Sequence, residues 1–165
     1  MAAEGPSPGA RAHVVGMTDV GRVREHNEDS FLVLNRTDGR RGGHAERFET
    51  ELDAALLLVV CDGMGGAAAG EVASRMAAER VAKELGTADF AASTPDQIAA
   101  LMDKAVQQAN TDIHAAAAAN PSQKGMGTTM TAAVVTPGRL YVSQVGDSRA
   151  YLLRKGLLNQ LTKDQ

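Results

Sequence analysis

An apolar run in the first half of the chain ends on a carboxylate, Asp62, and three glycines follow within four residues in LLLVVCDGMGG (56–66). Glycines alone are typical of the turn after a buried strand. They do not explain an ionisable side chain at the edge of the core, because burying a charge without a partner is costly. A phosphate cradle, a metal site and a simple tight bend are the interpretations that this pattern leaves open.

Other acidic residues occupy similar positions in the sequence. Glu28 and Asp29 lie in NED before an apolar run, and Asp147 lies in VGDSR just after one. If these strand ends meet Asp62 at one end of a sheet, they form a carboxylate cluster that is costly to bury without cations. Oxygen ligands suit a hard divalent cation, and a glycine after Asp62 lets the Gly63 carbonyl face the ion. Taken singly, GDSR is also consistent with an ordinary turn and NED with a solvated connection.

The glycine turn also fits a weak dinucleotide fingerprint, G-x-G-x-x-A, in GMGGAA (63–68). Asp62 argues against it, because a carboxylate would lie beside a pyrophosphate that needs amide donors. The acidic residue expected about 20 positions later falls at Glu84, inside a predicted helix. The metal site is the better interpretation.

Apolar periodicity predicts the strands that carry these residues. They are expected at 13–21, 30–35 and 54–60, the last buried on both faces, and as an antiparallel meander at 128–135, 140–145, 150–154 and 157–162. Residues 36–53 are polar and mixed in charge, which predicts a solvated hairpin loop. Strands, then helices, then strands predict an α+β fold with helices packed against an antiparallel sheet, not βαβ winding.

Two consecutive helices are predicted between these groups of strands. The first covers 69–85, and Gly86 marks its end. The second begins with a Thr-x-x-Gln capping box, Thr94 to Gln97, with Pro95 at the first helical position. Its apolar stripe is expected to fill the core, Met102 included: Ile98, Met102, Ala105 or Val106, Ala109 and Ile113.

Composition excludes several classes of protein. A chain of 165 residues with 44% apolar residues suits one globular domain, and a net charge of −3 gives no basic face for nucleic acid. Residues 1–11 are expected to be a disordered tail without the apolar core of a signal peptide. No apolar run reaches the roughly 18 residues of a membrane span. The single cysteine, Cys61, excludes an internal disulfide and a Cys-rich zinc site, so a cytoplasmic protein is expected.

Five motifs, in order along the chain, resemble those of the metal-dependent protein phosphatase family, type 2C, in its bacterial form. They are TDVGRVREHNEDSF, VVCDGMGGAAAGEVAS, GMGTTMTAAVV, LYVSQVGDSRAYLLRKG and LTKDQ. The resemblance implies an antiparallel β-sandwich flanked by helices, incomplete at the C-terminus. Residues 12–165 would then be the N-terminal part of a type 2C domain.

The resemblance also implies metal ligands. Asp62 would bridge two Mn²⁺ or Mg²⁺ ions, with the Gly63 carbonyl as a further ligand. Glu28 would reach the second ion through water, and Asp29 would support that shell. Asp147 is similar to the aspartate that helps to hold a third, weaker ion in bacterial members.

The implied reaction is direct hydrolysis of phosphoserine and phosphothreonine in proteins by a metal-activated water. Arg24 would hold the phosphate through two parallel hydrogen bonds, which makes Arg24 and Asp62 the expected catalytic residues. Cys61 is expected to be a core residue and not a nucleophile. Met64 stands where many eukaryotic relatives carry a histidine proposed as general acid, and His26 is expected to face solvent.

The implied partners are phosphorylated proteins made by bacterial Ser/Thr kinases, with no nucleic acid or membrane. The chain stops at Gln165, before the aspartates that complete the family's metal site, so a truncated chain with little activity alone is expected. One alternative is a degenerate phosphatase that binds phosphoproteins through Arg24 without hydrolysing them. Another is a switch that dephosphorylates an anti-sigma-factor antagonist.

Overall fold

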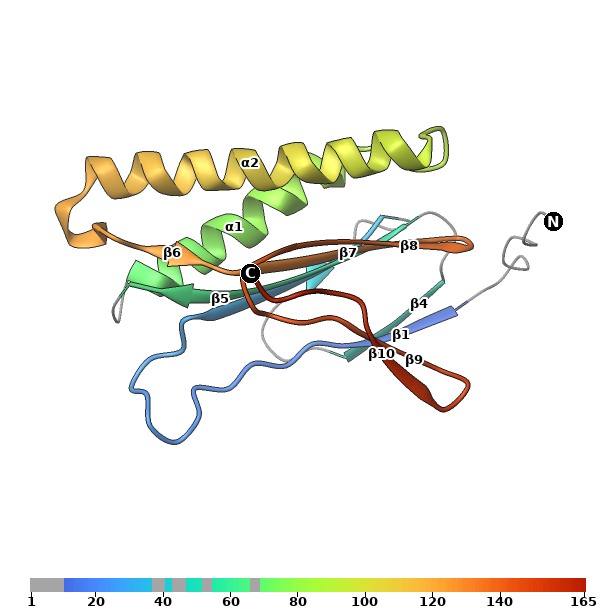
Figure 1. Cartoon of the computed structure of the whole chain (residues 1–165), viewed down its shortest axis with the longest axis horizontal. Coiled ribbons are helices and arrows are strands. Elements are labelled where there is room, and N and C mark those ends of the chain that lie inside the picture. The colour runs from blue at the N-terminus through green and yellow to red at the C-terminus, as the bar shows by residue number, and fades with distance from the viewer. Residues whose placement is uncertain (1–10, 37–40, 43–46, 52–54, 66–68) are drawn as a thin grey trace.

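The structure is a computed structural model that describes residues 11–36, 41–42, 47–51, 55–65 and 69–165. A layer of two helices covers one face of a six-stranded sheet, and two smaller sheets lie toward its other face (Figure 1). This arrangement confirms the predicted α+β class. Over the described ranges, no helix combines the length and the apolar character that crossing a bilayer requires.

The main sheet is antiparallel throughout, in the order β3-β2-β5-β7-β8, with β6 also paired to β5. Its strands are β2 (Asp29–Asn35), β3 (Arg41–Gly42), β5 (Leu56–Met64), β6 (Gly127–Thr128), β7 (Met130–Thr136) and β8 (Arg139–Val145). β5 pairs with β2 on one side and with β7 and β6 on the other, so neighbours fix it from both edges. The strand predicted over 54–60 therefore runs further than expected, and Asp62 lies inside it.

Two two-stranded sheets complete the β structure of the described ranges. They pair β1 (Arg11–Val15) with β4 (Arg47–Glu51), and β9 (Tyr151–Arg154) with β10 (Leu157–Gln160). Both lie on the side of the main sheet away from the helices (Figure 1). The predicted meander is thus broken after β8, because β9 and β10 leave the main sheet.

Two predictions about the N-terminal third are wrong. The strand expected over 13–21 ends at Val15, and the expected loop 36–53 contains β3 and β4. The polar sequence of this loop carries no strand periodicity; it forms strands because β2 and β1 offer it backbone partners. Of the predicted tail, residues 1–10 lie outside the described residues, and Arg11 already belongs to β1.

The helices follow their sequence signals. They are α1 (Ala69–Gly86) and α2 (Pro95–Ala119), followed by a short 3₁₀ turn, η1 (Pro121–Gln123). The capping box is present: the Gln97 amide donates to the Thr94 hydroxyl at 3.3 Å, and the Thr94 amide donates to the Gln97 side chain at 2.8 Å. These bonds satisfy amides that a helix start otherwise leaves unpaired.

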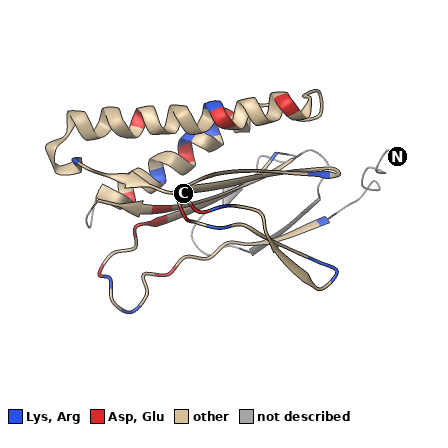
Figure 2. Cartoon of the chain, viewed as in Figure 1, with Lys and Arg blue, Asp and Glu red and all other residues tan. Residues whose placement is uncertain are grey.

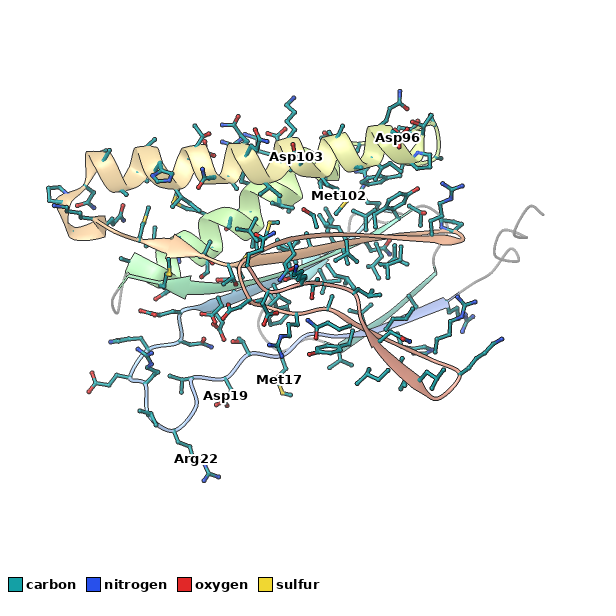
Figure 3. The ribbon with its side chains drawn as sticks, viewed as in Figure 1. Met17, Asp19, Arg22, Asp96, Met102 and Asp103 are labelled. Atoms are coloured by element: carbon teal, nitrogen blue, oxygen red, sulfur yellow. The ribbon has the colours of Figure 1, made fainter. Side chains whose placement is uncertain are left out.

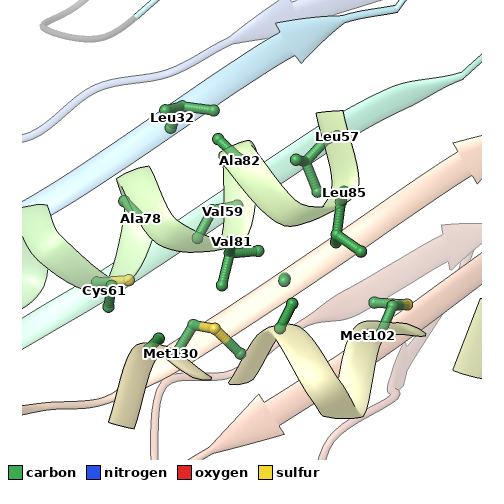
Figure 4. Packing of buried hydrophobic residues seen from close by; sticks show 14 of the residues in the cluster. Leu32, Leu57, Val59, Cys61, Ala78, Val81, Ala82, Leu85, Met102 and Met130 are labelled. Carbon is green, nitrogen blue, oxygen red and sulfur yellow. The ribbon is translucent and has the colours of Figure 1, made fainter. Parts of the chain in front are cut away.

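The main core lies between the helices and the sheet (Figure 4). α1 packs directly on β5 and β2, and α2 packs on α1. The stripe of α2 is buried as predicted, and Met102 is one of its core side chains (Figure 3). Its buried members are Ile98, Met102, Ala105, Ala109 and Ile113.

The two faces of β5 are covered unequally. Leu57 and Val59 are buried toward the helices, whereas on the other face Leu56 is buried and Val60 is 51% exposed. The prediction of burial on both faces is therefore wrong at Val60. A smaller cluster covers Leu56 on this face, where it packs with Val33 and Val14 contacts the cluster.

Candidate metal centre

Acidic residues meet where β2 begins and β5 approaches its end. The register of the two strands places Asp29 directly opposite Asp62. The Gly63 amide donates to the Glu28 carbonyl at 3.2 Å, which ties the residue before β2 to the same place. Figure 2 marks acidic residues in red at this end of the sheet. The structure thus brings together the predicted strand ends that carry Glu28, Asp29 and Asp62.

The electrostatics of this pair favour a bound cation. The pKa of Asp29 is raised above its usual value, first by partial burial, then by the charge of Asp62, a hydrogen bond to the Asp62 side chain and the charge of Glu28. The charged form of Asp29 is therefore repelled by the neighbouring carboxylates. A divalent cation bound by their oxygens relieves that repulsion, so the donor set fits Mn²⁺ or Mg²⁺.

The backbone of Asp62 is held on both sides by β6 and the residue after it. The Thr128 hydroxyl and the Thr129 amide both donate to the Asp62 carbonyl, at 2.9 and 2.8 Å. In return the Asp62 amide donates to the Thr129 hydroxyl at 3.0 Å. The two threonines therefore fix the backbone of a predicted metal ligand.

The start of α1 presses against the end of β5 at two glycines. A Cβ added at Gly63 would lie 2.2 Å from the Gly70 carbonyl oxygen and 2.6 Å from that of Glu28. A Cβ added at Gly70 would lie 2.9 Å from the Gly63 carbonyl carbon. Sequence reasoning did not single out Gly70. The available signal was a glycine in the first turn of a helix, where alanine is the better helix former.

Arg24 and His26 precede this cluster in the chain. Both are exposed on the connection from β1 to β2, which stands away from the helices (Figure 3, Asp19 and Arg22). Arg24 makes no hydrogen bond or ion pair with another residue in the described ranges. The connection is anchored next to Asp29, whose amide donates to the Asn27 side chain at 3.0 Å.

Asp147 is linked to the acidic residues through the adjacent Ser148 and not through its own side chain. It is exposed on the connection from β8 to β9, and the adjacent Ser148 hydroxyl lies 2.7 Å from the Thr129 hydroxyl. Within the part of the chain that the structure describes, no three His, Cys, Asp or Glu side chains are grouped closely enough to hold a metal ion. Asp29 and Asp62 thus lie opposite each other, and the expected cluster with Asp147 is not closed.

Two further residues of β5 bear on the chemistry. Cys61 is buried, and burial raises the pKa of its thiol to about 12, so the reactive thiolate is not available at neutral pH. Met64 is 63% exposed at the end of the strand and offers no titratable proton. The cysteine therefore belongs to the core, as expected, and the local chemistry is that of carboxylates.

Comparison with known proteins gives consistent matches. The family model for protein phosphatase 2C matches residues 44–165. The chain is 36% identical over 152 residues to the serine/threonine phosphatase stp of Listeria monocytogenes, covering 92% of this chain and 54% of that protein. It is 40% identical over 147 residues to the serine/threonine protein phosphatase PstP of Mycobacterium tuberculosis, covering 89% of this chain and 24% of PstP.

A solved structure of a relative extends the likeness to three dimensions. The catalytic domain of PstP in complex with two manganese ions matches with a TM-score of 0.66 and 37% identity, over 94% of this chain and 55% of that one. The chain thus spans about half the length of the Listeria relative and of this domain, and about a quarter of full-length PstP.

Proposed function

Since this chain belongs to the protein phosphatase 2C family, we propose that it forms the N-terminal part of a Mn²⁺- or Mg²⁺-dependent protein phosphatase. Its substrates are phosphoserine and phosphothreonine in cytoplasmic proteins that bacterial Ser/Thr kinases phosphorylate. The observation that carries the proposal is the cross-strand pair Asp29–Asp62, in which partial burial and then the charge of Asp62 raise the pKa of Asp29. Such a pair suits cation binding, and the relatives of this chain are phosphatases.

The proposed ligands are those at the end of β5. Asp62 and the Gly63 carbonyl would hold the ions, Glu28 would contribute through water, and Asp29 would support that shell. Asp147 would help to hold a third, weaker ion. When bound, the ions lower the pKa of a water molecule and screen the charge of the phosphate. The hydrogen bonds to the Asp62 backbone fix the part of β5 that carries this carboxylate.

The proposed role of Arg24 is to hold the phosphate. Its guanidinium can donate two parallel hydrogen bonds to phosphate oxygens. Its exposure and its lack of a partner among the described residues leave these donors available to a ligand. The anchored connection that carries it ends at Asp29, beside the proposed metals.

Mn²⁺-dependent hydrolysis of para-nitrophenyl phosphate tests the proposal. Where the gene continues past residue 165, we expect the complete product to be active and EDTA to abolish this activity. We expect little activity in the 165-residue chain, because its described residues form only half of a site. Asp62→Asn is expected to lower kcat/KM by at least about 100-fold, because it removes a ligand. Full activity of the Asp62→Asn variant would contradict the proposal. Phosphopeptide binding without turnover in both proteins would favour the non-catalytic binding module.

Arg24→Lys is expected to raise KM for a phosphopeptide by roughly tenfold, because lysine keeps the charge and loses the two-pronged contact. Thermal stability should not change, since Arg24 is exposed. The matched control is Arg22→Lys, an exposed arginine on the same connection. Equal KM values for the two variants would show that Arg24 does not hold the phosphate.

A further inference from the structure

The last residues of the chain fold back along the connection from β8 to β9, here called the Asp147 loop (residues 146–150). Four backbone amides donate hydrogen bonds between residues 161–165 and this loop or the end of β8. The Leu161 amide donates to the Ala150 carbonyl at 2.9 Å, and the Ala150 amide donates to the Thr162 hydroxyl at 3.0 Å. The Lys163 amide donates to the Gln144 side chain at 3.1 Å, and the Gln165 amide donates to the Gly146 carbonyl at 3.1 Å. Both ends of the loop are therefore held by the same segment.

A two-pronged ion pair joins the two segments. The Arg149 Nε donates to both carboxylate oxygens of Asp164, at 2.9 and 3.1 Å, and Nη2 donates to Oδ2 as well. The hydrogen bonds from Arg149 lower the pKa of Asp164, which favours its charged form. Side-by-side hydrogen bonds of this kind fix orientation as well as distance, which an exposed ion pair of simple charges does not.

The loop in turn rests on the residue that holds Asp62. Gly146 adopts a φ of +94° at which a Cβ would lie 2.8 Å from the Thr129 side chain, so the loop packs directly on Thr129. The Ser148 hydroxyl lies 2.7 Å from the Thr129 hydroxyl. The Thr129 hydroxyl in turn accepts a hydrogen bond from the Asp62 amide at 3.0 Å. Ser148 is itself held, because its carbonyl accepts the Thr131 hydroxyl at 2.7 Å.

We infer that Arg149 and Asp164 are positioning residues of the metal centre: their ion pair holds the Asp147 loop against Thr129 and, through it, against the backbone of Asp62. Neither side chain contacts the carboxylates of the centre. That this positioning matters for catalysis rests on the proposed function. The structural coupling between residue 164 and residue 62 can be tested without metal or substrate.

Amide hydrogen exchange in EDTA tests the link. Asp164→Asn keeps the shape of the side chain and removes its charge. We expect exchange at the Ala150 amide and at the Asp62 amide to accelerate by roughly fivefold or more, because a charge-assisted pair is lost and its neighbours open more often. A pair that only fastens the chain end would change Ala150 and leave Asp62 unchanged, and that result would overturn the inference.

The matched control is Asp112→Asn, which breaks another Arg–Asp pair. Arg80 and Asp112 join α1 to α2, and their side chains are less exposed than those of Arg149 and Asp164 (26% and 25% against 49% and 38%). We expect Asp112→Asn to leave exchange at Asp62 unchanged. Equal acceleration at Asp62 in both variants would mean that general destabilisation, and not positioning, is the cause.

Mn²⁺ affinity, measured by electron paramagnetic resonance of the free ion, links the positioning to the centre. Asp164→Asn is expected to weaken binding about tenfold, as loss of a group that orients a ligand does, with Asp112→Asn unchanged. Asp164→Glu, which keeps the carboxylate, should recover part of the loss. Unchanged affinity in Asp164→Asn would overturn the positioning role. If the complete wild-type product bound no Mn²⁺, that result would instead contradict the proposed ligands, and the exchange data would still decide the structural coupling.

Discussion

Gly63→Ala is expected to lower the free energy of unfolding by about 3 kcal/mol, because the added methyl group has no space. It would lie 2.2 Å from the Gly70 carbonyl oxygen and 2.6 Å from that of Glu28. Both are backbone atoms, so no side chain can rotate away. Relief requires α1 to move off β5, which opens the core beneath it. Urea unfolding in EDTA measures this change without a contribution from metal.

The matched control is Gly86→Ala, at the other end of α1. There the nearest atom to an added Cβ is the flexible end of Leu34, at 3.3 Å. We expect a change within about 1 kcal/mol, because a small shift of Leu34 costs little and alanine is the better helix former. A Gly63→Ala variant as stable as Gly86→Ala would show that α1 and β5 are not locked together at the metal centre.

This lock means that the candidate site is set by the fold and not by a mobile loop. Asp62 lies inside β5, one residue before the glycine that α1 covers, and hydrogen bonds from β6 hold its backbone. A ligand on a backbone fixed in this way needs less reorganisation to bind an ion than a ligand on a mobile loop. The same packing explains why two glycines are needed where the strand and the helix meet.

The elements with strong local signals were predictable from the sequence. The capping box from Thr94 to Gln97 and the apolar stripe of α2 were both confirmed, because helix caps and 3.6-residue periodicity depend on neighbours in sequence. β4 was not predictable, since its polar residues form a strand only by pairing with β1. The early end of β1 at Val15 likewise depends on where its partner β4 lies.

The candidate site divides in the same way. The convergence of Asp29 and Asp62 followed from acidic residues at successive strand ends, and the register of β2 and β5 confirms it. The contributions of Gly70, Ser148 and Asp164 come from contacts between segments far apart in the chain. The spacing of residues within one motif does not predict contacts between distant segments, so these contacts could not be predicted from a single sequence.

Asp29→Asn is expected to have opposite effects on the chain with and without metal. In EDTA it should raise the melting temperature, because the raised pKa of Asp29 shows that its charged form is unfavourable in the folded state. The folded chain binds this proton more tightly than the unfolded chain, so wild-type stability rises as pH falls through the raised pKa. The difference between variant and wild type should therefore be largest near pH 7 and shrink toward pH 4.

With Mn²⁺ the order should reverse. An ion at about 100 times its dissociation constant stabilises a folded protein by about 2.7 kcal/mol, and each tenfold loss of affinity removes about 1.4 kcal/mol of this. Asp29→Asn removes a charge that the ion would neutralise, so most of the gain from Mn²⁺ should disappear. The control Asp103→Asn, exposed on α2, should match wild type in both conditions. If Mn²⁺ instead stabilises the Asp29→Asn variant as much as wild type, the ion binds elsewhere. An ion bound between Asp29 and Asp62 must remove the repulsion between the two carboxylates, and the variant has no such repulsion to remove.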